Sequence, residues 1–190
     1  MGNYLNPGNI GFEEIRNSQY VDKSGLIALI NDTIGTKQKL TCISRPRRFG
    51  KSFAAQMLCA YYDKTCDSSA LFENLEISTN EKLSRTYKQH LNRYDVIYLD
   101  MTAVIGAANA VSAAGNKFIM VIDEWDAPIR EAGDQPIVQK EYLEFLRSLF
   151  KNSGMTAKVF AAAYMTGILP IKKDASQSAI SDFEEFTMVK

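Results

Sequence analysis

The sequence predicts an α/β fold, in which helices cover a mainly parallel central sheet, and three features indicate it. Short apolar runs typical of strands alternate along the chain with segments of helical periodicity. One run, at residues 118–122, is continuously apolar, as expected of a central parallel strand covered on both faces. The chain has 190 residues, of which 46% are hydrophobic, enough to bury one core. We therefore expect a three-layer sandwich formed by a single domain, residues 1–190.

The first third of the chain predicts one strand with a helix on either side of it. Residues 1–17 are rich in polar and turn-forming residues and are expected to be loop with little helix. Residues 24–32 have apolar side chains at helical spacing, and residues 33–38 form a turn region. Residues 40–44 are the first strand. A helix over residues 51–62 is expected to pack one face on the sheet, formed by Phe53, Ala54, Met57, Leu58 and Tyr61.

The middle of the chain predicts a helix and the second strand. Residues 63–77 show no regular pattern, whereas residues 78–81 have the spacing of a capping box and predict a helix over 78–93. Leu83, Tyr87 and Leu91 form its apolar stripe. Its other side is basic, which is typical of a solvated face and less often of nucleic-acid contact; that side carries Lys82, Arg85, Lys88 and Arg93. Residues 95–101 are the second strand.

The last part of the chain predicts two more strands around a long helix. The third strand is expected at residues 117–123, and only the fourteen residues 103–116 connect it to the second, near the minimum for a parallel crossover. Residues 137–152 form an amphipathic helix that ends before Gly154. The fourth strand is expected at residues 158–165. The polar tail contains one candidate helix near residues 179–186.

A phosphate-binding loop is predicted between the first strand and its following helix, where residues 44–52 read SRPRRFGKS. Backbone N–H groups of such a loop and of the helix N-terminus point at phosphates. Lys51 would neutralise the β- and γ-phosphates, the Ser52 hydroxyl would hold Mg²⁺, and Gly50 lets the backbone approach closely. The Walker A pattern is incomplete, because Arg45 stands where its first glycine belongs. Taken alone, the tripeptide also fits an ordinary helix start with Lys51 solvated.

A second element favours the phosphate-binding interpretation. The third strand runs directly into Asp123 and Glu124, as in a Walker B motif, at the sheet edge where α/β folds bind ligands. Asp123 would hold the Mg²⁺ shell, and Glu124 would orient or deprotonate the attacking water. Two acids at a strand end are usually solvated charges, but together with the upstream loop they predict a P-loop NTPase fold that binds nucleotide.

The residues around the loop extend the predicted nucleotide site, which comprises Arg45, Pro46, Arg47, Arg48, Phe49, Gly50, Lys51, Ser52 and Phe53. The three arginines have two interpretations. They contact phosphates, which a guanidinium matches bidentately, or one of them pairs with Asp22 or Glu124 in the empty site. Trp125 is interpreted as a packing residue, and Asp126 as a residue that orders Arg130 or its loop.

Composition argues against several classes of function. The chain carries 22 basic and 22 acidic residues, so it has no overall field that would attract nucleic acid, and a nucleic-acid partner would need a local patch. Three cysteines without metal-ligand spacing are interpreted as buried free thiols. His90, the single histidine, is expected on a solvated helix face. No apolar stretch has the length or the flanking charges of a membrane span or a secretory signal, so a cytoplasmic location without a membrane partner is expected.

Four pieces of the chain resemble the bacterial and archaeal AAA-ATPase-like domain family: YVDK at residues 20–23, SRPRRFGKS at 44–52, IDEWD at 122–126 and TGILPI at 166–171. The resemblance implies that Arg45 is normal for the family. It also implies that an additional strand, here residues 158–165, separates the P-loop strand from the Walker B strand. Thr166 would then be a sensor-like group near the γ-phosphate.

The resemblance also sets the expected organisation of the chain. It implies an N-terminal segment over residues 1–36, a nucleotide-binding core over 37–170 and a shortened tail over 171–190. Relatives carry a longer helical segment where this chain has residues 103–116, and they continue into a lid and a nuclease-like region. An effector domain or partner protein is therefore expected, and the oligomeric state stays open.

Three functions remain open at this point. The favoured one is a module that binds ATP and Mg²⁺, hydrolyses ATP slowly and serves as a switch for an effector, with Lys51, Glu124 and Thr166 as catalytic residues. The second is a non-catalytic module that binds nucleotide or a partner. The third is a small-molecule phosphotransferase, although the sequence does not indicate a pocket for a phosphate acceptor.

Overall fold

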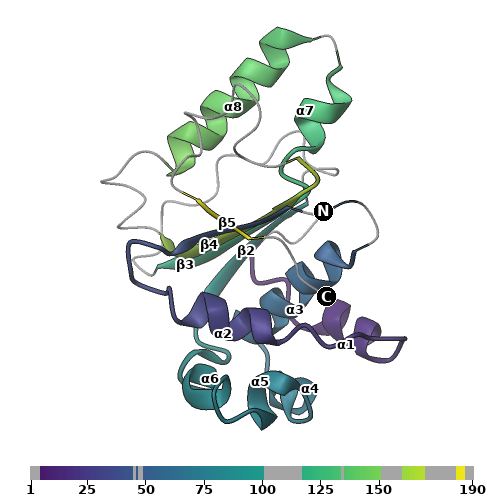
Figure 1. Cartoon of the computed structure of the whole chain (residues 1–190), viewed down its shortest axis with the longest axis vertical. Coiled ribbons are helices and arrows are strands. Elements are labelled where there is room, and N and C mark those ends of the chain that lie inside the picture. The colour runs from purple at the N-terminus through teal and green to yellow at the C-terminus, as the bar shows by residue number, and fades with distance from the viewer. Residues whose placement is uncertain are drawn as a thin grey trace.

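Five parallel strands form the centre of the molecule, in the order β2-β3-β4-β1-β5 (Figure 1). The computed structural model describes residues 5–44, 46, 49–100, 117–133, 135–150, 160–169 and 183–186. The strands are β1 (Leu40–Ser44), β2 (Asp95–Asp100), β3 (Phe118–Asp123), β4 (Phe160–Gly167) and β5 (Glu184–Phe186). The expected α/β fold of P-loop type is confirmed, and β4 is inserted between β1 and β3 as the resemblance implied.

Alternation along the strands sends side chains into two separate cores, one on each face of the sheet. On β3, Ile119 and Val121 belong to one core, whereas Phe118, Met120 and Ile122 belong to the other. Every residue of β3 is buried, because β2 and β4 flank it and helices cover both faces. The continuous apolar run therefore marks the centre of the sheet, as predicted.

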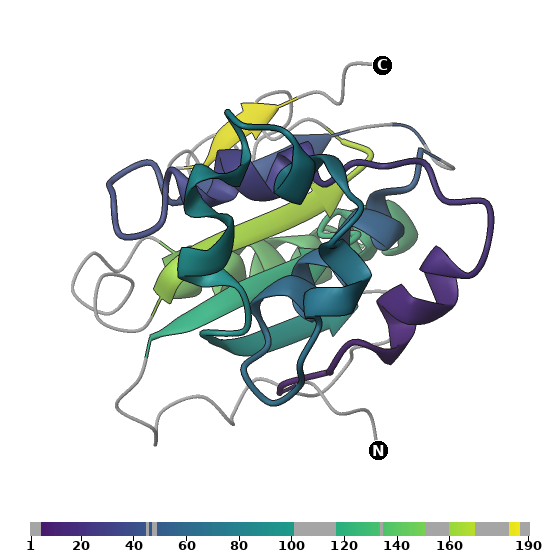
Figure 2. The same ribbon diagram turned by 90° about the horizontal axis from the view of Figure 1, so that it is seen from below.

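Among the described residues, seven helical segments lie on one face of the sheet, which Figure 2 shows from below. The three nearest are α1 (Ile10–Arg16), α2 (Gly25–Asn31) and α3 (Lys51–Tyr62). Beyond them lie α4 (Ser69–Phe72), α5 (Glu76–Thr79), the 3₁₀ helix η1 (Ser84–Thr86) and α6 (Tyr87–His90) (Figure 1). The large core on this face includes the buried aromatic residues Phe12, Tyr61, Tyr62 and Phe72.

The opposite face carries α7 (Ala127–Glu131) and α8 (Pro136–Phe150) (Figure 1). The apolar stripe of α8 supplies Leu146 and Phe150 to the second core, where Phe150 contacts Phe160 and Phe183 edge-on or tilted. Two helical layers therefore sandwich the sheet. Among the described residues, no helix combines the length and the apolar character that crossing a membrane requires.

The predicted helix over residues 78–93 is wrong, and so is the expectation that residues 1–17 hold little helix. The first is three short elements, α5, η1 and α6, and the second contains α1. The helix begins earlier than predicted, because Asp22 Oδ2 and Ser24 Oγ accept the first N–H groups of α5, those of Glu76 and Ile77. It ends at Asn80, whose backbone is extended and whose Oδ1 accepts the Lys82 N–H in a local turn. Ser78 instead donates its hydroxyl back to the Leu75 carbonyl.

Two single-residue expectations on this face are also wrong. His90 is 8% exposed rather than solvated, and its Nδ1 lies 2.7 Å from the Tyr94 hydroxyl, because the short elements turn this residue inward. Phe53 is 46% exposed rather than packed in the core, because it lies in the first turn of α3, at the edge where the sheet ends. The other four residues of its predicted face are buried or in the core: Ala54, Met57, Leu58 and Tyr61.

The tail also differs from its prediction. Where a helix was expected over residues 179–186, residues 184–186 form β5, which pairs with β1 through Thr41, Cys42 and Ile43. Ladder hydrogen bonds to an otherwise open strand edge outweigh the local helical preference. The predicted crossover 103–116, the cap at Gly154 and the three loop arginines Arg45, Arg47 and Arg48 lie outside the described residues.

Candidate functional site

The candidate site lies at the edge of the sheet where β1, β3 and β4 end. Because these neighbouring strands are parallel, their carboxyl ends meet at one edge, and the groups that follow them converge there. The chain passes from β1 through the loop into α3 at Gly50, whose φ of +74° is a left-handed conformation that glycine adopts without steric cost. This turn places Lys51 at the start of α3, beside the end of the sheet.

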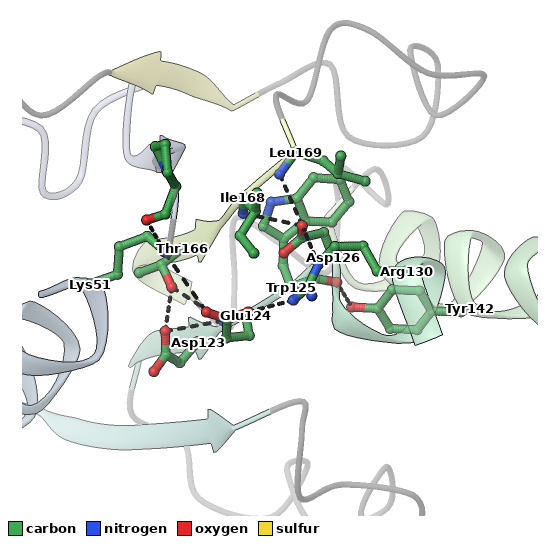
Figure 3. A network of polar contacts seen from close by, with 11 residues as sticks. Lys51, Asp123, Glu124, Trp125, Asp126, Arg130, Tyr142, Thr166, Ile168 and Leu169 are labelled. Atoms are coloured by element: carbon green, nitrogen blue, oxygen red, sulfur yellow. Dashed lines mark hydrogen bonds and ion pairs between the residues drawn. The ribbon is translucent and has the colours of Figure 1, made fainter. Parts of the chain in front are cut away.

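Lys51 is the buried cation of this edge. It is 4% exposed, and its Nζ donates a hydrogen bond of 3.1 Å to the Pro46 carbonyl within the loop. The same Nζ lies 3.8 Å from Glu124 Oε1, so the lysine after β1 and the acid after β3 meet across the sheet edge. The sequence predicted both residues, and the structure brings them together (Figure 3).

Asp123 and Thr166 lie side by side at the ends of β3 and β4. The strand register pairs Ile122 with Met165, which sets the next residue of each strand opposite the other. Thr166 donates its hydroxyl to Asp123 Oδ1, and both side chains are almost completely buried. The Glu124 N–H reaches the same hydroxyl oxygen at 3.2 Å. Thr166 therefore links the two acids that follow β3.

Glu124 has an unusual backbone conformation at this point. Its φ of +53° lies in the left-handed region that a residue with a side chain rarely adopts. Such strain persists only where surrounding contacts impose it, and it is concentrated at functional sites. Here Thr166 holds the Glu124 N–H, and the next residue, Trp125, donates its N–H to the Thr166 carbonyl at 2.8 Å.

A second polar cluster adjoins Glu124 (Figure 3). Arg130, on α7, donates from Nη2 to Glu124 Oε2 at 2.5 Å and from Nε to Asp126 Oδ2 at 2.8 Å. Asp126 is completely buried, and its Oδ2 also accepts the N–H groups of Ile168 and Leu169 at 3.1 and 2.9 Å. The loop after β3 is thereby tied to the loop after β4.

Trp125 packs beneath this cluster rather than facing the site, as predicted. It is 1% exposed, and its carbonyl accepts a hydrogen bond from the Tyr142 hydroxyl of α8. Burial, aided by the charge of Asp126, raises the pKa of Tyr142, so its hydroxyl stays a donor at neutral pH. Gly167 is needed for this packing, since a Cβ there would lie 2.4 Å from Trp125 Nε1.

Comparison with known proteins gives the family. A family model described as "Predicted AAA-ATPase" matches the chain at residues 8–113 and 105–176. The chain belongs to this AAA-ATPase-like family. The two matched segments together span most of the chain, and they overlap at residues 105–113, within the stretch where the sequence predicted a shortened crossover. No curated protein and no solved structure matched it.

The loop of this AAA-ATPase-like protein receives a contact from a segment that lies more than twenty residues earlier in the chain. Lys23 lies in the YVDK segment, just before α2. The structure places its Nζ 2.5 Å from the Phe49 carbonyl and close to Gly50, against the phosphate-binding loop. Asp22 accepts the Ser24 N–H just before α2 and the Glu76 N–H at the start of α5, each at 2.7 Å. The YVDK segment therefore joins the loop to α5.

The remaining predicted loop residues are exposed. Ser52 lies in the first turn of α3, Pro46 lies in the loop, and Phe49 and Phe53 are 43% and 46% exposed. The sequence missed the contact of Arg130 with Glu124. Its spacing four residues after Asp126 does signal the other ion pair of this arginine, which was expected.

The donor atoms present fit a magnesium ion that a nucleotide would bring with it. Mg²⁺ prefers oxygen ligands and is usually held by one or two carboxylates together with substrate phosphates. Asp123 supplies a carboxylate at the end of β3, and Ser52 supplies a hydroxyl on α3, which packs against β3. Within the described ranges, no group of three or more acidic, histidine or cysteine side chains is arranged to hold a metal without a substrate.

Proposed function

We propose that this protein binds ATP at the edge formed by Lys51, Asp123, Glu124 and Thr166, and that it hydrolyses ATP slowly in a magnesium-dependent reaction. The observation that supports the proposal most is the approach of Lys51 Nζ to Glu124 Oε1, at 3.8 Å, in a member of an AAA-ATPase-like family. A phosphate-binding cation and a water-activating acid are the two groups that hydrolysis of a phosphoanhydride needs.

The electrostatics of Lys51 favour an anionic ligand. The ammonium group is buried, and its Nζ lies 3.8 Å from Glu124 Oε1, beyond hydrogen-bond distance, so an anionic oxygen that came closer would gain a charge-assisted hydrogen bond. A triphosphate contributes several anionic oxygens, which would replace the Pro46 carbonyl as acceptor. The N–H groups at the start of α3, after the left-handed turn at Gly50, would supply further donors.

The proposed mechanism is an in-line attack of water on the γ-phosphate. Glu124 accepts the proton of the attacking water, and Lys51 stabilises the charge that develops on the phosphate oxygens. Thr166, which already holds Asp123 and the Glu124 N–H, would lie next to the transferred group. Asp123 and Ser52 would hold the magnesium ion, which supplies neutralisation of phosphate charge when bound.

Calorimetric titration of Mg²⁺-ATP into the wild type and Lys51→Ala tests the binding part of the proposal. We expect Lys51→Ala to weaken binding by about 10- to 100-fold, the value of one charge-assisted hydrogen bond. Lys140→Ala is the matched control, since this lysine on α8 is 78% exposed and pairs with Glu144 only at 4.0 Å. Equal ATP affinity in the wild type and Lys51→Ala would contradict a P-loop role for this lysine.

Release of phosphate by wild type and Glu124→Gln tests the hydrolytic part. The amide keeps the size of the side chain and removes its basicity, so we expect ATP binding to persist and turnover to fall to the background rate. A wild type that binds ATP without turnover would instead be a nucleotide-binding module without catalysis. The role as a switch for an effector rests on the family resemblance alone and would be tested afterwards.

A further inference from the structure

The two carboxylate oxygens of Glu124 face different cations. Oε1 faces Lys51 Nζ at 3.8 Å, on the side of the phosphate-binding loop, whereas Oε2 accepts a hydrogen bond from Arg130 Nη2 at 2.5 Å. The contact with Arg130 is much the closer of the two, and both side chains are largely buried. The carboxylate is therefore held at one oxygen while the other points toward the loop (Figure 3).

Arg130 is itself fixed, because it is anchored on Asp126. Its Nε donates to Asp126 Oδ2 at 2.8 Å, and Asp126 is completely buried and bound to the N–H groups of Ile168 and Leu169. A guanidinium has several donors in a rigid plane, so one edge can be anchored while another holds a second carboxylate. Arg130 can therefore keep its position when Lys51 moves from Glu124 to a bound phosphate.

The main chain of Glu124 is held by β4, on the other side of the residue from Arg130. Its φ of +53° is maintained while its N–H is held at the Thr166 hydroxyl. The main chain is fixed by β4 and the end of the side chain by α7, so the rotation of the carboxylate is restricted at both ends. An ion pair at a protein surface does not require both the main chain and the carboxylate of a residue to be fixed. A catalytic group does require it, because its rate depends on a precise position relative to the substrate.

We infer that Arg130 is a positioning residue for the water-activating acid: it holds Glu124 Oε2 so that Oε1 is presented to the phosphate side of the site. The inference rests on the proposed ATP hydrolysis. When Lys51 turns to the phosphates, Oε1 is released, while Oε2 remains on Arg130. The attacking water then loses one proton to Oε1 as its oxygen bonds to the γ-phosphorus, and the bond from that phosphorus to the β–γ bridging oxygen breaks.

Two other roles for Arg130 predict different behaviour. If it served only to neutralise buried Asp126, its loss would destabilise the fold and act independently of Glu124. If it contacted the phosphates directly, its loss would weaken ATP binding even where Glu124 is replaced. A residue that acts through Glu124 has no further effect once the carboxylate is gone, so a double-mutant cycle separates the three.

The experiment compares wild type, Arg130→Gln, Glu124→Gln and the double variant, with ATP affinity from calorimetry and kcat and KM from phosphate release. We expect Arg130→Gln to lower kcat about 100-fold through misplacement of Glu124, with the ATP dissociation constant changed by no more than about twofold. The double variant should be no slower than Glu124→Gln. Arg85→Gln is the control, because Arg85 is exposed on η1 and its Nε bonds only a neighbouring carbonyl among the contacts described.

Arg130→Lys and Asp126→Asn keep the test valid if Arg130→Gln fails to fold. A lysine retains the charge but cannot hold Glu124 and Asp126 together, so kcat should recover only in part. Asp126→Asn keeps the guanidinium and weakens its anchor, so kcat should fall while ATP binding persists.

Three results would overturn the inference. They are an unchanged kcat in Arg130→Gln, a kcat in the double variant below that of Glu124→Gln, and a loss of ATP binding together with turnover in Arg130→Gln. A wild type that binds ATP without any turnover would also overturn it. A wild type that binds no ATP would instead refute the proposed function.

Discussion

Replacing Gly167 with alanine is predicted to destabilise the protein at the point where β4 leaves the sheet. A Cβ at this position would lie 2.4 Å from Trp125 Nε1, 2.6 Å from Trp125 Cδ1 and 2.8 Å from Asp126 Oδ1. All three distances are shorter than real Cβ contacts, so either the indole or the loop must shift. Neither is free to do so, because Trp125 is 1% exposed and Asp126 is held by Arg130 and two backbone N–H groups.

The magnitude follows from the cost of overpacking. Forcing one extra methyl group into a tightly packed site costs about 1–3 kcal/mol, and for a chain of this length each kcal/mol lowers the melting temperature by about 2–4 °C. The assay is urea unfolding, followed by the fluorescence of Trp125, which is the single tryptophan of the chain. Gly25→Ala is the matched control, since its Cβ would meet Leu83 Cδ1 at 3.7 Å, an ordinary contact.

The expected order of stability is therefore Gly25→Ala at or above wild type and Gly167→Ala clearly below it. Gly25 begins α2, where alanine lowers the entropy of the unfolded chain without a clash. If Gly167→Ala were as stable as Gly25→Ala, the close packing of the loops after β3 and β4 would be refuted. The network that fixes Arg130 would then lose its structural basis.

Three further predictions concern the backbone, pH dependence and thiols. Glu124→Gly should be more stable than Glu124→Ala in chemical unfolding, by about 1–2 kcal/mol, because only glycine adopts a φ of +53° without strain; equal stabilities would argue against that conformation. Burial lowers the pKa of His90 below its usual 6.5, so the unfolded chain binds the proton more readily. Stability should fall as the pH drops below about 6.5, and His90→Gln should flatten that dependence in melting experiments across this range. Burial raises the pKa of all three thiols, but Cys42 and Cys59 are completely buried whereas Cys66 is partly exposed, so mass spectrometry of alkylated native protein should find Cys66 modified first.

The sequence pattern predicted correctly those elements whose position depends mainly on the burial of their own side chains. The strands β1 to β4 and the helix after the loop have the predicted bounds within a few residues, because strands inside a sheet covered on both faces are largely apolar. The Lys51 and Glu124 pair could be foreseen for the same reason, since parallel strands end at a common edge. The predicted roles of these residues stay predictions until nucleotide binding is measured.

The wrong predictions arise mainly from contacts between residues distant in sequence. The helix predicted over residues 78–93 begins early, at Glu76, because its first N–H groups bond Asp22 and Ser24, more than fifty residues earlier in the chain, and it is broken by a turn at Asn80. The tail became a strand because β1 offered an edge for pairing. At the start of α5 and in the tail, a contact distant in sequence outweighed a local preference, which amounts to only a few tenths of a kcal/mol to about 1 kcal/mol per residue.

The sequence by itself determined the fold class, the family and the residues that end each central strand, because burial and backbone geometry restrict which residues can stand there. Only the tertiary structure decided how those residues are held. Glu124 has a left-handed backbone and pairs with Arg130, which in turn pairs with Asp126. These contacts form because α7 folds back toward the ends of β3 and β4. Hydrogen bonds and ion pairs act over a few ångströms, so their partners are chosen by the packing of the elements and not by spacing along the chain.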